Sequence, residues 1–180
     1  GALWFGGRVG VSKFDPSLKL FNLFNQFELD GKPTNNNLYS IYETRDSTIW
    51  IGTLGGGIAK FNPQTEQLEI IPLVKDGDIE TKSIRSFYED SQNTLWVGTR
   101  KEGLFSYNRE TKKFKHHPPQ RPEINVNTIS HIMEDSDGRL WLGTRWGLAS
   151  YDRDSLKYTV YQTGYLSNNQ IYQIVEDKKR

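Results

Sequence analysis

Hydrophobic and polar residues alternate along most of the chain in short runs that turn-forming residues separate. Examples are Phe21-Asn22-Leu23 and Leu68-Glu69-Ile70. This period of two is typical of β-strands with one buried face. No window of a dozen residues keeps the 3.6-residue apolar spacing of a helix between capping residues. The pattern therefore predicts an all-β protein with essentially no α-helix.

The strand pattern repeats around a tryptophan motif that stands at four places. The motif reads LWFGG at 3–7, IWIGT at 49–53, LWVGT at 95–99 and LWLGT at 140–144, and its tryptophans are 46, 46 and 45 residues apart. Two apolar segments follow every motif, and one precedes each of the last three motifs, with a further one at 171–177, so a complete unit holds four short strands. Four strands in such a period match one blade of a β-propeller.

We therefore expect an all-β fold, a β-propeller built of four-stranded antiparallel blades, with 1–180 as a single propeller segment of about four repeats. The second to fourth strands of one blade fall in 1–37, and complete blades in about 38–82, 83–127 and 128–169. Residues 170–180 supply the first strand of a next or composite blade. Two arrangements stay open. The chain is either a slice of a larger ring with exposed edge strands, or a ring of four that the composite blade closes.

Composition narrows the classes of partner. The chain has 23 Lys and Arg against 22 Asp and Glu, so its formal net charge is only +1. Such a balance gives no strong positive potential that would attract nucleic acid. It has no cysteine, which excludes disulfides, thiol nucleophiles and cysteine-ligated metals. No run approaches the roughly 18 apolar residues of a membrane span, and this stretch shows no signal peptide. We expect no cofactor, no nucleic acid and no direct membrane contact.

Residues that recur in every repeat are explained by the repeat itself. Repeated Glu-Asp pairs argue against a catalytic site, which needs one asymmetric pair, and favour carboxylates that hold turns. The neighbours His116 and His117 point to opposite faces of a strand and cannot readily chelate one metal; the third histidine is His131. The tryptophans at the repeated position are expected to pack the blades: Trp4, Trp50, Trp96 and Trp141.

Residues that differ between repeats give a better guide to function, because ligand sites on repeat scaffolds lie in variable loops. Arginine stands four residues after tryptophan in three repeats, asparagines recur in the links, and one tryptophan lies outside the repeat. Arginine forks, amides and an indole suit a polar or acidic sugar. The alternative is that each arginine pairs with a nearby carboxylate. The candidate ligand-binding residues are Arg8, Arg100, Arg145, Trp146, Asn36, Asn127 and Asn168.

Taken together, the segments I-x-x-I-x-E-D, L-W-x-G-T, G-L-x-x-Y-D and F-x-x-Y resemble the two-component regulator propeller repeat. That family is found in periplasmic sensor regions of bacterial hybrid two-component systems, especially those that sense polysaccharide breakdown products. The resemblance implies a slice of a larger propeller in the periplasm, a non-enzymatic role in this segment, and a histidine kinase elsewhere in the parent protein. It also implies an oligosaccharide ligand.

Two other functions stay open beside this one. The first is a protein-interaction scaffold or dimerisation propeller, with a homodimer formed through blade edges or faces. The second is a polysaccharide lyase or hydrolase propeller, although no asymmetric catalytic set stands out in the sequence.

Overall fold

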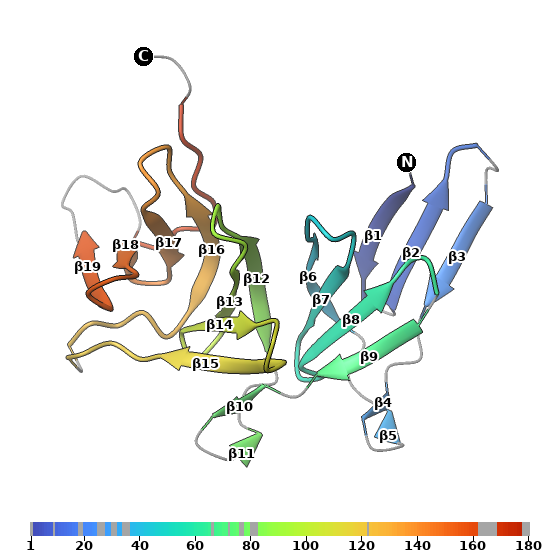
Figure 1. Ribbon diagram of the computed structural model, residues 1–180, viewed down its shortest axis with the longest axis horizontal. Helices are drawn as coiled ribbons and strands as arrows, with labels where there is room; N and C mark the ends of the chain where they lie inside the picture. The colour runs from blue at the N-terminus through green and yellow to red at the C-terminus, as the bar shows by residue number, and fades with distance from the viewer. Residues whose placement is uncertain are drawn as a thin grey trace. The chain divides into compact units, whose positions relative to one another are not determined.

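Every element assigned in this structure, a computed structural model, is a β-strand (Figure 1). The structure describes residues 2–8, 10–17, 20–24, 28–29, 32–33, 37–65, 67–71, 73–75, 78–79, 83–121, 123–161 and 169–177. These residues include no helix, and thus none long and apolar enough to cross a bilayer. The chain divides into two compact units, Gly1–Ile84 and Arg85–Arg180.

The first unit holds two antiparallel sheets whose strands follow chain order. One sheet has three strands, β1 (Leu3–Gly7), β2 (Gly10–Asp15) and β3 (Leu20–Phe24). The other has four strands, β6 (Leu38–Glu43), β7 (Ile49–Thr53), β8 (Ile58–Asn62) and β9 (Gln67–Ile71). The indole of Trp4 packs edge-on against Phe61, with 5.2 Å between ring centroids. The two sheets therefore share one apolar core.

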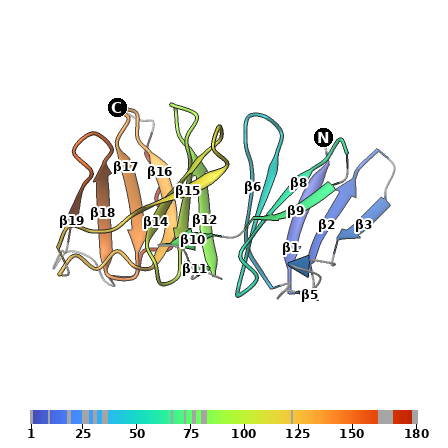
Figure 2. The ribbon, with the colours of Figure 1, turned by 60° about the horizontal axis from the view of Figure 1, so that its bottom comes forward.

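Two more four-stranded sheets follow from the boundary between the units onward. Strands β12 (Ile84–Glu89), β13 (Leu95–Thr99), β14 (Leu104–Asn108) and β15 (Lys113–His117) form one sheet. Strands β16 (Ile129–Glu134), β17 (Leu140–Thr144), β18 (Gly147–Asp152) and β19 (Lys157–Tyr161) form the other. Figure 2 shows these sheets side by side, and a core that includes Trp96 and Tyr151 fills the space between them.

The predicted blade is confirmed, because each four-stranded sheet runs from a first strand through the tryptophan strand to two outer strands. The glycine of the motif makes this stacking possible. A Cβ at Gly98 would lie 2.8 Å from Cγ2 of Ile129, on the first strand of the following sheet, and would also overlap Ser86 Oγ. A Cβ at Gly143 would meet Cγ2 of Ile171 in the same way, at 2.9 Å. Only glycine allows neighbouring sheets to approach so closely.

Two small hairpins in the links between blades were not predicted. They pair β4 (Glu28–Leu29) with β5 (Lys32–Pro33), and β10 (Val74–Lys75) with β11 (Asp78–Ile79). In both cases an Asp-Gly pair stands between the two strands in the sequence. This pair is the strongest short signal for a two-residue hairpin, so the sequence did contain the information.

The segment 169–177 has no strand assignment, although its sequence predicts a first strand. Its backbone still approaches β17, because the Ile171 N–H donates to the Thr144 carbonyl at 2.9 Å. No strand of the described residues pairs with it. A strand assignment requires a ladder of such bonds, which explains the difference from the prediction.

Candidate ligand-binding rim

The loops that follow the tryptophan strands are braced by a threonine in the three repeats whose motif ends in that residue. Thr99 and Thr144 are buried, and their hydroxyls donate to the carbonyls of Gly103 and Gly147 at 3.0 and 2.7 Å. The same hydroxyl oxygens accept amides of the loops. The Glu102 N–H donates to Thr99 Oγ1 at 2.9 Å, and the Trp146 N–H donates to Thr144 Oγ1 at 3.0 Å. Each loop is therefore held at its base while its outer side chains stay exposed.

In the second unit these loops meet the link between the two sheets. We call this edge the loop rim and define it as residues 100–102, 125–128 and 145–146. The Thr128 hydroxyl donates to the Arg100 carbonyl at 2.5 Å, and the Arg145 N–H donates to the Thr128 carbonyl at 3.2 Å. Asn127 joins through its carbonyl, which accepts the Gly103 N–H at 2.9 Å. The structure thus brings Arg100, Asn127 and Arg145 together.

Trp146 stands on the same rim with 46% of its surface exposed, which is high for an indole. The Arg145 guanidinium carbon lies 5.7 Å from its ring centroid, within the range of a cation–π contact. The pair presents a flat apolar face beside a fork of donors. This is the chemistry that a sugar with polar or acidic substituents requires.

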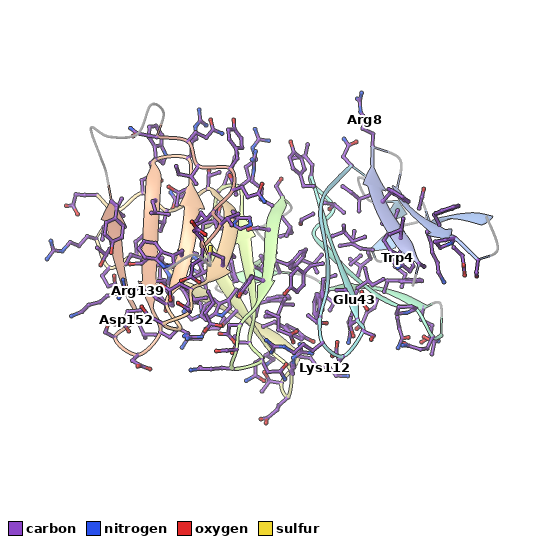
Figure 3. All side chains as sticks on the ribbon, turned by 90° about the horizontal axis from the view of Figure 1, so that it is seen from above. Trp4, Arg8, Glu43, Lys112, Arg139 and Asp152 are labelled. Carbon is purple, nitrogen blue, oxygen red and sulfur yellow. The ribbon has the colours of Figure 1, made fainter. Side chains whose placement is uncertain are left out.

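The remaining candidate residues are not placed on this rim. Arg8 belongs to the first unit, is exposed, and extends away from the end of β1 (Figure 3). Asn36 and Asn168 lie outside the described residues. Four of the seven candidate ligand-binding residues therefore lie on the loop rim: Arg100, Asn127, Arg145 and Trp146.

The four repeat tryptophans lie in their sheets at different depths. Trp50 and Trp96 are buried, with 1% and 4% of their surfaces exposed. Trp4 and Trp141 are half-buried. Each of the four is the second residue of its strand, which is the second strand of the four-stranded sheets and the first strand, β1, of the three-stranded sheet.

The opposite edge of the second unit carries the repeated carboxylates, and we call it the carboxylate rim. Asp90 accepts the amides of Gln92 and Thr94 on one oxygen and the Trp96 indole N–H on the other, at 3.0, 2.8 and 2.7 Å. Asp135 accepts its turn amides and the Trp141 indole in the same way. Burial acts to raise the Asp135 pKa, but these hydrogen bonds outweigh it and lower the pKa. The repeated aspartates thus hold turns, as we expected from their repetition.

Arg153, which the sequence interpretation missed, joins the two sheets at this rim. Its guanidinium donates to Asp90 at 2.7 Å and to Glu134 at 2.8 Å, and Asp90 is fully buried. Glu134 in turn accepts the Ser91 N–H at 2.6 Å, so the first strand of one sheet also holds the turn of the sheet before it. The signal was an arginine directly after Asp152, at a place where Arg109 follows Asn108.

A serine–histidine pair lies between β14 and β15, where the sequence did not place a catalytic base. His117 Nε2 lies 2.8 Å from Ser106 Oγ, and Nδ1 lies 2.7 Å from the Tyr151 hydroxyl. Burial, with smaller contributions from Lys115 and His116, lowers the His117 pKa to about 4. Burial also raises the pKa of Tyr151 to about 12, so the phenol keeps its proton. A histidine with a pKa of about 4 is a weak general base at neutral pH. The hydrogen bonds of His117 to Ser106 and Tyr151 instead link the third and fourth sheets.

The buried His117 predicts a pH-dependent fold. Its pKa is about 4 in the folded chain and about 6.5 when unfolded, so the folded state favours the neutral ring. The associated stability is complete above about pH 6.5 and is lost as the pH falls towards 4, by about 3 kcal/mol. Urea unfolding at pH 7, 5.5 and 4 measures this slope. His117→Gln should flatten it, and an unchanged slope in that variant would assign the effect to other groups.

The described residues contain no group of three or more histidines, aspartates or glutamates that could hold a metal ion. His131 lies on β16, whereas the other two histidines lie on β15, and its Nδ1 accepts the Ile174 N–H at 3.4 Å.

The sequence profile described as two-component regulator propeller matches residues 32–55, 78–101 and 123–146. Three stretches of this chain are thus similar to the two-component regulator propeller repeat. Each matched stretch includes the first strand, the tryptophan strand and the start of the loop that follows it. A search of the curated proteins found no match.

Solved structures with a similar fold include extracellular domains of two-component systems. The extracellular domain of BT4673 from B. thetaiotaomicron, described as a hybrid two-component system, is 28% identical and superposes with a TM-score of 0.82 over 98% of this chain. This chain spans 24% of the chain in that structure. The extracellular domain of BT3049 from the same organism, 21% identical, shares the fold at a TM-score of 0.76 over 98% of this chain and 22% of its own.

The propeller fold extends to enzymes as well. Virginiamycin B lyase of Staphylococcus aureus is 13% identical and superposes with a TM-score of 0.66 over 91% of this chain and 53% of its own. At this identity the likeness concerns the fold alone, so it assigns no chemistry to the repeats described above.

Proposed function

We propose that this chain is part of an extracellular or periplasmic sensor propeller and that its loop rim binds an oligosaccharide. The observation that carries the proposal is the exposed Trp146 beside the Arg145 guanidinium. Its support from relatives is the 28% identity to an extracellular domain of a hybrid two-component system. A sensor domain needs a ligand surface that leaves the stacked sheets intact, and loops braced by buried threonines provide one.

The loop rim favours a sugar with acidic or polar groups over an apolar ligand. Arg100 and Arg145 are both exposed, and their backbones are linked through Thr128. Guanidinium groups can bind carboxylates in a bidentate manner, while the indole packs against the apolar face of a pyranose. The two kinds of contact together discriminate an acidic oligosaccharide from a neutral one.

We propose further that this segment binds without catalysing a reaction. The pair that most resembles a nucleophile and its base is Ser106 with His117, and burial keeps that histidine neutral with a pKa of about 4. Tyr151, and not a carboxylate, faces Nδ1. Ser106, His117 and Tyr151 thus connect neighbouring sheets, whereas the exposed side chains of the loop rim are suited to binding a ligand.

Trp146→Ala tests the ligand surface. We expect the variant to lose no more than about 1 kcal/mol of stability, because nearly half of the residue's surface is exposed and it lies outside the apolar core. We expect it to bind an oligosaccharide roughly tenfold more weakly, since the stacking face is lost. The measurement is calorimetric titration with a panel of neutral and acidic oligosaccharides, followed by the shift in Tm that the best ligand causes.

A matched pair of arginine variants provides the control. Arg139 lies 5.7 Å from the Trp141 ring centroid, as Arg145 does from Trp146, but it belongs to the carboxylate rim. Arg145→Ala should weaken binding and Arg139→Ala should leave it unchanged. A panel in which no oligosaccharide binds, or in which Trp146→Ala binds as tightly as the parent, would overturn the proposal.

A further inference from the structure

The link between the third and fourth sheets bends outward before it enters β16. Figure 1 and Figure 2 both show it leaving the end of β15 and passing beside β19, the outer strand of the fourth sheet. Between the link and this strand lies a cavity of about 690 Å³, a volume typical of sites for small molecules, which we call the link cavity. The link contributes Arg121, Glu123 and Ile124 to its lining, and the strand contributes Lys157, Tyr158 and Val160.

The strand side of the link cavity is turned towards the third sheet, within the second unit. Tyr158 stands opposite Tyr151 in the pairing of β18 with β19, and its hydroxyl donates to the His117 carbonyl on β15. Tyr151 packs against Trp96 of the third sheet, with 5.7 Å between ring centroids. This wall is thus held by contacts between two complete four-stranded sheets.

The floor of the link cavity is apolar and continuous with the core. Ile124 and Val160 are half-buried and pack against the cluster of buried residues between the two sheets. Tyr158 belongs to that cluster and has 6% of its surface exposed. An apolar group that enters the cavity is therefore removed from water, which favours its binding.

The contacts of the link fix the shape of its side of the cavity. Pro118 and Pro119, at its start, have restricted backbone angles. A turn follows, in which the Ile124 N–H donates to the Arg121 carbonyl at 3.1 Å. Val126, towards the far end, is fully buried in the core. The link cavity is therefore formed before a ligand enters it, which lowers the entropy cost of binding.

Charged side chains of both signs stand at the mouth of the link cavity. Arg121 and Glu123 are exposed, and no ion pair among the described residues includes either of them. Lys157 adds a second positive charge, and Asp152 lies opposite it in the sheet. A purely anionic ligand would be repelled by Glu123, and a purely cationic one by Arg121. The mouth is therefore complementary to a ligand that carries both charges.

We propose that the link cavity binds a free amino acid with an apolar side chain. Its carboxylate pairs with the Arg121 guanidinium, which can hold both oxygens at once, and its ammonium pairs with the Glu123 carboxylate. Its side chain packs on Ile124, Tyr158 and Val160. The residues that line this cavity are not those of the loop rim, so the site is independent of the oligosaccharide surface proposed above.

Calorimetric titration with three related probes tests the two charged contacts. The probes are L-phenylalanine, its amide, which lacks the carboxylate, and N-acetyl-L-phenylalanine, which lacks the ammonium. We expect L-phenylalanine to bind roughly tenfold more tightly than either analogue, because each analogue loses one charge-assisted contact. Equal binding of L-phenylalanine and its N-acetyl derivative would indicate a site for anions and overturn the proposal.

Two variants of exposed residues assign each contact to its side chain without disturbing the fold. Arg121→Ala should weaken the binding of L-phenylalanine roughly tenfold and leave the binding of its amide unchanged. Glu123→Ala should weaken the binding of L-phenylalanine by a similar factor and leave that of N-acetyl-L-phenylalanine unchanged. Arg139→Ala removes an exposed arginine from the carboxylate rim and is the matched control, which should bind all three probes as the parent does.

This crossed pattern of losses is the result that supports the proposal. Binding of L-phenylalanine that neither Arg121→Ala nor Glu123→Ala weakens would place the amino acid elsewhere on the chain and overturn it. Failure of L-phenylalanine, L-leucine and L-tryptophan to bind the parent chain at millimolar concentrations would overturn it as well. Neither of these failures bears on the loop rim, which is tested with oligosaccharides and Trp146→Ala.

Discussion

Replacing Arg153 with alanine is expected to lower the free energy of unfolding by about 3 kcal/mol. The guanidinium lies 2.7 Å from the fully buried Asp90, and its loss removes the positive charge from that site. Asp90 retains the Trp96 indole and two turn amides, which places the effect at the lower end of the range for a broken buried pair. Urea denaturation at pH 7 measures it.

Arg109 supplies the matched control for Arg153. It holds the equivalent turn position and pairs with Glu89, but its side chain is 27% exposed, against 17% for Arg153. The Glu89 side chain is itself only 2% exposed, so Arg109→Ala leaves a buried carboxylate without this guanidinium and should cost about 2 kcal/mol. We expect the larger loss for Arg153→Ala, because Arg153 bridges the two carboxylates of Asp90 and Glu134, and equal losses in the two variants would contradict this reason.

Replacing Trp96 with alanine is expected to cost about 3 to 5 kcal/mol, as large-to-small changes in packed cores do. The indole is 4% exposed and lies 5.1 Å from the His117 ring and 5.7 Å from the Tyr151 ring, measured between centroids. Its removal opens a cavity between two sheets and takes the indole N–H from Asp90. Thermal unfolding followed by circular dichroism measures the loss.

Trp96→Phe separates the two contributions. Phenylalanine keeps most of the apolar contact and removes only the hydrogen bond to Asp90, so this variant should lose less than the alanine variant, about 1 to 2 kcal/mol. If Trp96→Ala unfolded at the same Tm as the parent, the assignment of this residue to the core between sheets would be wrong.

The blade could be predicted from the sequence because each of its determinants is local. Alternation, the tryptophan period and the turn residues fall within one repeat, and the motif glycine marks the close approach of the next sheet. The candidates on the loop rim were found by comparing repeats. Arg100, Asn127 and Arg145 come together because their loops lie at one end of their sheets and meet at Thr128.

Contacts between sheets could not be predicted in the same way. Arg153 reaches Asp90, a residue 63 positions earlier, and nothing in the turn sequence indicates that its side chain crosses to another sheet. Thr44 replaces the repeated aspartate in the second sheet, and Asp46 accepts its hydroxyl at 2.6 Å and the Thr48 amide at 3.1 Å. In this turn a different side chain accepts the amide hydrogen bond, and only the three-dimensional structure identifies it.

The unequal joins between sheets have a consequence for cooperativity. In the second unit, buried ions and the Glu134–Ser91 contact couple one sheet to the next. In the first unit, Pro63 stands at the turn position of Arg153, and the shared core of apolar residues forms the join. In a linear array each repeat transmits stability only through its neighbours. Propagation of unfolding along this chain is therefore governed by its individual joins, so that loss of one sheet need not carry the whole array with it.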